Sequence, residues 1–82
     1  MTPSLTILEE LRLDSTTTQF RVKLAPASIV FVQACIESYE GLATIRTQDN
    51  EIGILEITTT RDLEEECKEL IHNLNHELRP SM

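Results

Sequence analysis

The chain has 82 residues, of which 40% are apolar and 26% are charged, as is typical of one small globular domain. Fourteen acidic residues oppose seven basic ones, and the net charge of −7 argues against nucleic-acid binding, because phosphate contacts need clustered Lys and Arg. The longest apolar run, residues 29–32, is too short to cross a bilayer, and no secretory signal precedes it. We therefore expect a cytoplasmic protein with no membrane partner.

Residues 5–13 fit two structures. Their leucine and isoleucine side chains match one face of a strand that Glu9 interrupts, and they match a short helix equally well. In residues 17–24 apolar and polar side chains alternate, which predicts a half-buried strand that ends before Pro26.

Residues 27–40 are predicted to form a helix. Gly41 follows at a place where a left-handed residue commonly ends a helix, and the segment is longer than a typical strand. The positions that recur at helical spacing are Ser28, Phe31 or Val32, Cys35, Ile36 and Tyr39.

Residues 42–48 and 51–58 are predicted to form a hairpin. Apolar and polar side chains alternate in its first arm, and Asp49 and Asn50 between the arms tolerate the backbone angles of a tight turn. Gly53 is expected to mark a bulge or a close approach of another backbone segment.

Residues 60–78 carry the strongest helical pattern. A run of acidic residues near its start suits the positive end of the helix dipole, and we expect this run to be solvated or to attract a basic partner. Residues 79–82 follow as a loose tail, because Pro80 stops a helix. One apolar stripe runs along the helix: Leu63, Cys67, Leu70, Ile71, Leu74 and Leu78.

These elements predict a single small α+β domain over residues 1–82, with a ferredoxin-like split β-α-β sandwich of order β-α-β-β-α. Two helices would cover one face of an antiparallel sheet. The last strand of that plan is missing. The extension of residues 1–16 fills the gap as an extra edge strand paired with residues 17–24, which we prefer, or the gap pairs with another subunit.

The run from Cys35 to Thr47, CIESYEGLATIRT, resembles the signature of a small bacterial family called domain of unknown function 4911. That family is similar in having a strand, a helix that ends in a motif of acidic residues, tyrosine, glycine, leucine and alanine, and then a hairpin. The resemblance implies a ferredoxin-like or ACT-like pattern. It implies no activity, so no functional residue is transferred from the family.

The motif itself has two interpretations. In the structural one, Tyr39 packs at the base of the helix and Gly41 supplies a turn that a Cβ atom would obstruct. In the functional one, Tyr39, Glu40, Gly41 and Arg46 contact a ligand at this corner.

A second candidate site is a pair of histidines. His72 and His76 are four residues apart, which places both imidazoles on one side of a helix, as a metal site requires. Glu65 and Glu69 lie on the same side. This row points away from the apolar stripe, so the alternative is a solvated helix face.

The two cysteines, Cys35 and Cys67, form no CxxC pair and fall within the apolar stripes of the two helices. We expect core packing, with raised pKa values and inert thiols; a redox role is the alternative.

No nucleophile is paired with a base and no glycine-rich phosphate loop is present, so we expect neither an enzyme nor a cofactor. The first hypothesis is a non-enzymatic protein-interaction or regulatory module that forms a homodimer or binds another protein. The alternatives are an ACT-like sensor that binds a small molecule at a subunit interface, and a metal-handling accessory protein that uses His72 and His76.

Overall fold

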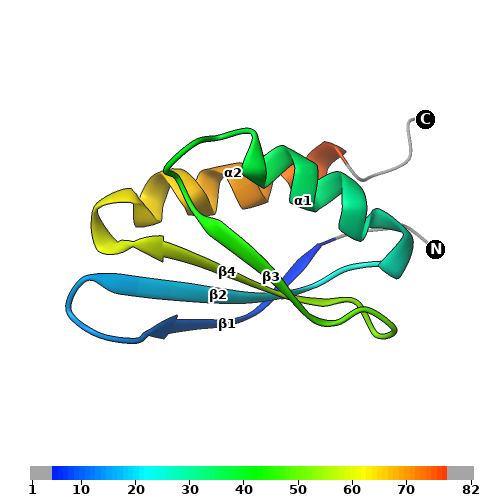
Figure 1. The fold of residues 1–82 in the computed structure, drawn as a ribbon, viewed down its shortest axis with the longest axis horizontal. Coiled ribbons are helices and arrows are strands. Elements are labelled where there is room, and N and C mark those ends of the chain that lie inside the picture. Colours follow the sequence, from blue (N-terminus) through cyan, green and yellow to red (C-terminus); the bar gives the residue numbers. More distant parts are fainter. Residues whose placement is uncertain (1–4, 78–82) are drawn as a thin grey trace.

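The computed structural model describes residues 5–77, and it describes side chains from residue 5 to residue 74. Short 3-10 turns, Pro26–Ser28 and Arg61–Leu63, lead into the two helices. The elements follow in the order β1 (Thr6–Arg12), β2 (Thr17–Lys23), α1 (Ile29–Glu37), β3 (Thr44–Asp49), β4 (Ile54–Thr60) and α2 (Glu64–Glu77) (Figure 1).

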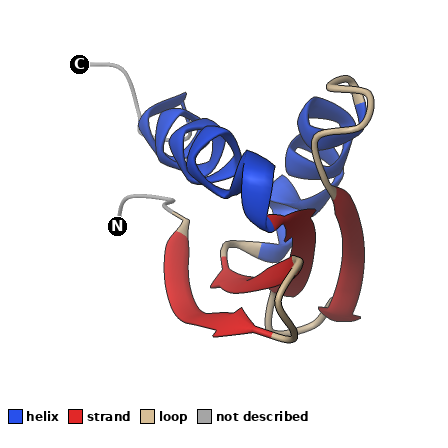
Figure 2. Cartoon of the chain, turned by 90° about the vertical axis from the view of Figure 1, so that its left-hand side faces the viewer, coloured by secondary structure: helices blue, strands red, loops and turns tan. Residues whose placement is uncertain are grey.

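The four strands form one antiparallel sheet in the order β1-β2-β4-β3. Both helices lie on the same side of this sheet, and no helix of residues 5–77 lies on the other side (Figures 1 and 2). The predicted α+β class, with two helices over an antiparallel sheet, is therefore confirmed. No helix in the described part of the chain is long and apolar enough to cross a membrane.

Of the two predictions for residues 5–13, the strand is confirmed and the helix is wrong. β1 pairs with β2 as a hairpin, which the Leu13 amide closes by donating to the Thr17 carbonyl at 2.9 Å. Leu8 is the extra residue of a bulge in this pairing. The tertiary partner decides between the two structures here, since β2 offers a free edge and the local sequence does not choose.

The core lies between the sheet and the helices. β2 and β4 alternate between buried and partly exposed residues, as the period of two predicts. Every second side chain of these strands meets the apolar faces of α1 and α2. The side chains with less than 2% exposure include Phe20, Val22, Val32, Ile36, Leu55, Ile57, Cys67 and Ile71.

Helix α1 ends earlier than the sequence suggests. The Ser38 hydroxyl donates to the Cys35 carbonyl at 2.6 Å, and the Tyr39 amide donates to the Ile36 carbonyl at 3.1 Å, which tightens the last turn. Tyr39 therefore lies beyond the helix and is 52% exposed, so the prediction that it packs at the helix base is wrong. Phe31 is exposed too, and Val32 takes the buried position.

Gly41 serves a turn of its own and does not end the helix. The Leu42 amide donates to the Tyr39 carbonyl at 3.1 Å, and Gly41 has a φ of 77°. A positive φ at the third residue is what a type II turn requires, and glycine adopts it without strain.

Gly53 confirms the expectation of a close backbone approach. Its φ is 93°, its carbonyl accepts from the Leu24 amide at 2.9 Å, and a Cβ atom there would lie 1.9 Å from the Leu24 oxygen. The turn between β3 and β4 is shaped by Asp49, whose Oδ1 accepts from the amides of Glu51 and Ile52 at 3.0 Å. The hairpin tip is thus held against the end of β2.

We expect Gly53→Ala to lower the free energy of unfolding by more than Gly41→Ala does. Both variants carry a cost of about 1–2 kcal/mol for a positive φ, but only Gly53→Ala adds a backbone clash, with a further cost of about 1–3 kcal/mol. A Cβ atom on Gly41 would have no neighbour within 4 Å. Urea denaturation of the two variants measures the difference, and equal losses would contradict this account.

The apolar stripe predicted for α2 is confirmed from Leu63 to Leu74: Cys67, Ile71 and Leu74 are buried and Leu70 packs beside them. Leu78 and the predicted tail of residues 79–82 lie outside the described residues.

Candidate functional site

Glu64, in the first turn of α2, is a buried carboxylate with 7% exposure. The Thr18 hydroxyl donates to its Oε1 at 2.6 Å, Arg12 approaches Oε2 at 3.4 Å, and Arg61 approaches Oε1 at 3.7 Å. The Thr18 hydrogen bond, followed by Arg12 and Arg61, lowers the pKa of Glu64 below its ordinary value even though burial opposes this. The prediction that the whole acidic run is solvated is therefore wrong at Glu64.

The Thr18 hydroxyl and the Arg12 and Arg61 side chains all bind the Glu64 carboxylate, which indicates a structural role for this residue. They come from β1, β2 and the 3-10 turn before α2, so the carboxylate connects these three elements to the helix. Sequence reasoning missed this because Glu64 looks like its exposed neighbours Glu65 and Glu66, and only the fold brings Thr18 and Arg12 to it.

We expect the stabilisation by Glu64 to depend on pH. Because its folded-state pKa is lowered, the contribution is complete above the ordinary pKa of 4.5 and is lost as the pH falls through the lower folded value. Glu64→Gln should therefore be less stable than the parent chain at neutral pH, and the difference should shrink in acid. Thermal unfolding across this pH range measures it, with Glu65→Gln as the exposed control; a difference that is independent of pH would contradict the assignment.

The Tyr39 corner contains a small cavity. Its volume is about 180 Å³ and its lining is Tyr39, Glu40, Gly41, Leu42, Leu63 and Glu66. Three of the four proposed ligand contacts thus come together, and Glu66 joins them from α2. The fourth, Arg46, lies elsewhere: it stands opposite Glu56 in the sheet, in the row of β3 that alternates with the helix-facing row of Ile45.

A second cavity, which the sequence did not suggest, lies at one end of the sheet. The strand register brings Thr17 opposite Thr60 and Thr44 opposite Thr58, so hydroxyls from three strands gather without any charged group. Its volume is about 340 Å³ and its lining is Thr17, Gly41, Leu42, Ala43, Thr44, Thr58, Thr59 and Thr60.

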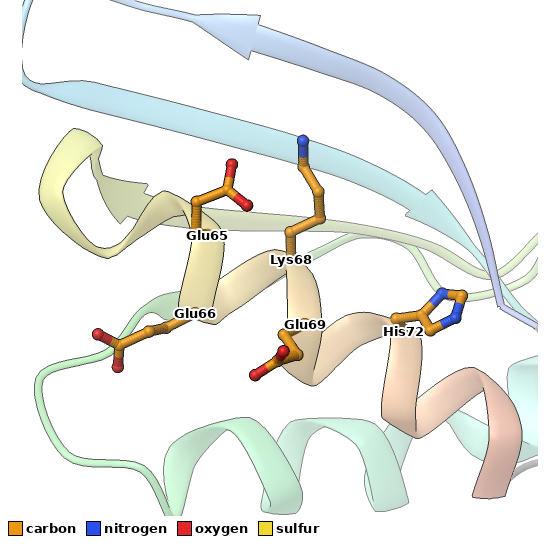
Figure 3. Close-up of a pocket in the computed structure, with 5 residues that line it drawn as sticks. All are labelled: Glu65, Glu66, Lys68, Glu69 and His72. Atoms are coloured by element: carbon orange, nitrogen blue, oxygen red, sulfur yellow. The ribbon is translucent and has the colours of Figure 1, made fainter.

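The predicted metal row lies on the outer side of α2. Glu65, Glu66, Lys68, Glu69 and His72 line a depression of about 370 Å³, and their side chains point apart (Figure 3). Lys68 extends to Glu10 of β1 at 3.2 Å. Within the described side chains no group of three His, Cys, Asp or Glu is placed to hold a metal ion. His76 belongs to α2, but its side chain lies outside that part of the structure.

Cys67 is fully buried, and burial raises its pKa to about 11, so the expected core packing and raised pKa are confirmed for this residue. Cys35 is half-buried and packs against the edge of the core.

The helix-free side of the sheet carries a row of alternating charges. The register places Glu9, Arg21, Glu56 and Arg46 opposite one another across all four strands, and Arg21 pairs with Glu9 at 3.2 Å. Opposite charges on neighbouring strands stabilise a sheet. The row is electrically balanced, so it has no excess charge of its own to attract a charged ligand.

The edge strand β1 differs from the other strands because all seven of its residues are exposed. The exposed side chains include large apolar groups, which at such an edge are unusual in a solvated strand. They are Ile7, Leu8 and Leu11 in the strand and Leu13 just after it.

These features define a small α+β protein with a helix-free sheet side, an apolar edge strand and two shallow cavities near the Tyr39 corner. The pattern of the family described as Domain of unknown function (DUF4911) matches residues 22–77, and the chain belongs to that family. The resemblance seen in the sequence is therefore confirmed. No curated protein and no solved structure shows significant similarity to the chain.

Proposed function

We propose that the protein is a non-enzymatic interaction module that self-associates through the edge of β1. The observation that carries this proposal is that every residue of β1 is exposed and that several of its exposed side chains are large and apolar. An edge strand presents unpaired N–H and C=O groups to any second strand that approaches, and natural proteins usually protect such an edge.

β1 is apolar toward both sides of the sheet. Ile7 stands opposite Val22, which faces the helices, whereas Leu11 stands opposite Gln19, which faces the open side. An edge strand that stays in water needs polar side chains on at least its open side. Apolar groups on both sides suit a strand whose side chains pack beside those of a further neighbouring strand.

The charged side chains of β1 do not protect its edge effectively, because each of them forms an ion pair within the same chain. Arg12 is drawn to Glu64, Glu10 to Lys68 and Glu9 to Arg21. The bulge at Leu8 interrupts the strand near its start, which leaves the regular stretch from Glu9 to Arg12 as the edge available for pairing.

We further propose that the fold is the ferredoxin-like plan, with β1 in the position of its last strand. The sheet order β1-β2-β4-β3 supports this, since β2, α1, β3, β4 and α2 then follow the plan in sequence and β1 lies beside β2. The self-association proposal consequently rests on the exposed apolar edge and not on a missing strand.

We expect the parent chain to form a dimer in solution and the double variant Leu8→Lys, Leu11→Lys to dissociate. Two charges at the edge would need to be desolvated on pairing, which should weaken the dimer at least tenfold, or by about 1.4 kcal/mol. Sedimentation velocity over a concentration series measures the change, and circular dichroism checks the fold. The matched control is Ile52→Lys, because Ile52 is 54% exposed but lies in the turn between β3 and β4.

Two results would contradict the proposal: a parent chain that remains monomeric at the highest concentration, or a dimer that is weakened as much by Ile52→Lys as by the double variant at β1.

The cavity at the Tyr39 corner supports a second candidate, an ACT-like sensor of a small molecule. Tyr39 offers an aromatic ring, and Glu40 and Glu66 offer carboxylates on the same cavity. A ligand with an ammonium group matches this chemistry.

For this candidate we expect lysine or arginine to raise the melting temperature, and Tyr39→Ala to abolish the rise. A ligand at 100 times its dissociation constant adds about 2.7 kcal/mol to the free energy of unfolding. Differential scanning fluorimetry measures the shift, with acetate as the anionic control. No shift with either amino acid would exclude this ligand class.

A further inference from the structure

We infer that two copies of the chain pair β1 with β1, antiparallel, in one register whose two-fold axis passes through Leu11. This inference rests on the proposed self-association and adds to it the contacts that the second copy makes. It follows from the backbone directions, the positions of the charges and the bulge of β1.

The backbone of β1 sets which residues can bond outward. The Leu13 amide donates to Thr17 of β2, and Leu11 and Glu9 share its direction because hydrogen-bonding direction alternates along an antiparallel strand. Glu10 and Arg12 therefore present their N–H and C=O groups to the free edge. Any β1–β1 pairing has to bring outward-facing residues opposite each other, so its two-fold axis passes through a residue of the strand and not between two residues.

The charges select among the registers that remain. An axis at Glu9, Glu10 or Arg12 places two identical charges opposite each other, which destabilises a strand pair. An axis at Leu8 falls in the bulge. With the axis at Leu11, Glu10 lies opposite Arg12 of the second copy and each such pair exchanges both backbone hydrogen bonds.

The surrounding side chains fit the same register. Glu10 already contacts Lys68 at 3.2 Å and Arg12 contacts Glu64 at 3.4 Å, both on the helix side of the sheet. Pairing Glu10 with Arg12 of the second copy joins these ion pairs into a row of alternating charge. On the open side, Leu11 meets Leu11 of the second copy, which covers apolar surface that water contacts in the monomer.

A two-fold axis through a residue of an edge strand runs perpendicular to the sheet. The two four-stranded sheets would therefore continue into one, with all helices on the same side (Figure 2). Such an interface closes on itself and uses up the β1 edge, so it yields dimers and not filaments.

Cysteine crosslinking tests the register, in a Cys35→Ser background that removes the half-buried native thiol. Only the residue on the axis faces its own copy, at a Cβ–Cβ distance of about 4.5–5.5 Å, close to the span of a disulfide. We expect Leu11→Cys to give a covalent dimer on mild oxidation. Glu9→Cys and Leu13→Cys should each stay uncrosslinked alone and give a mixed dimer together, because residues 9 and 13 are opposed. Both chains of the mixed pair retain Leu11, so this pair still tests the register if the Leu11→Cys substitution itself weakens the dimer.

The outcomes separate the two proposals. If the parent chain sediments as a dimer but neither Leu11→Cys nor the mixed pair crosslinks, or if Glu9→Cys crosslinks alone, the register is wrong and self-association stands. If the parent chain is a monomer and no variant crosslinks above the level of a urea-unfolded control, the proposed function fails. Crosslinking of Leu11→Cys and of the mixed pair, without crosslinking of Glu9→Cys alone, supports both.

Discussion

Burial of one carboxylate determines how the N-terminal hairpin meets the second helix. Glu64 leaves water at the start of α2, and it is compensated there by the Thr18 hydroxyl and by Arg12 and Arg61. The first two partners lie on β2 and β1. A shift of the sheet against α2 would therefore expose the Glu64 carboxylate to water or leave it buried without its partners. Pairing with β2 makes β1 the edge strand, and this constraint fixes how the β1–β2 hairpin lies against α2.

The same network decides which side chains of β1 remain for a partner. Because Arg12 and Glu10 are held by α2 and Glu9 by β2, the charges lie along the faces of the sheet and leave the edge itself bare. A net charge of −7 makes two copies repel each other at a distance. A specific contact must then bring unlike charges together at short range. The register through Leu11 does so, because it places Glu10 opposite Arg12 of the second copy.

Much of the fold could be predicted from the sequence, because its apolar residues recur at regular strand or helix spacing. The alternation in residues 17–24 and the stripe from Leu63 to Leu74 each point to one structure, and the structure has it. At Gly53 the sequence left a bulge or a close backbone approach, and the structure shows the close approach. Residues 5–13 were ambiguous because their apolar positions satisfy both periods, and pairing with β2 resolves them. The end of α1 was misplaced because the hydrogen bond from Ser38 to Cys35, a local side-chain effect, ends the helix before Tyr39.

The candidate sites were harder to predict, since nearness in the chain is a poor guide to nearness in space. Arg46 follows Tyr39 closely in sequence, yet it lies opposite Glu56 in the charged row of the sheet, while Glu66 of α2 reaches the Tyr39 cavity from far along the chain. The family pattern covers residues 22–77 and so includes both helices, β3 and β4. β1 and most of β2 precede it, although Arg12 and Thr18 bind a carboxylate inside it. The shared part of the chain thus builds the scaffold, and the edge that this scaffold holds in place is where we locate the interaction.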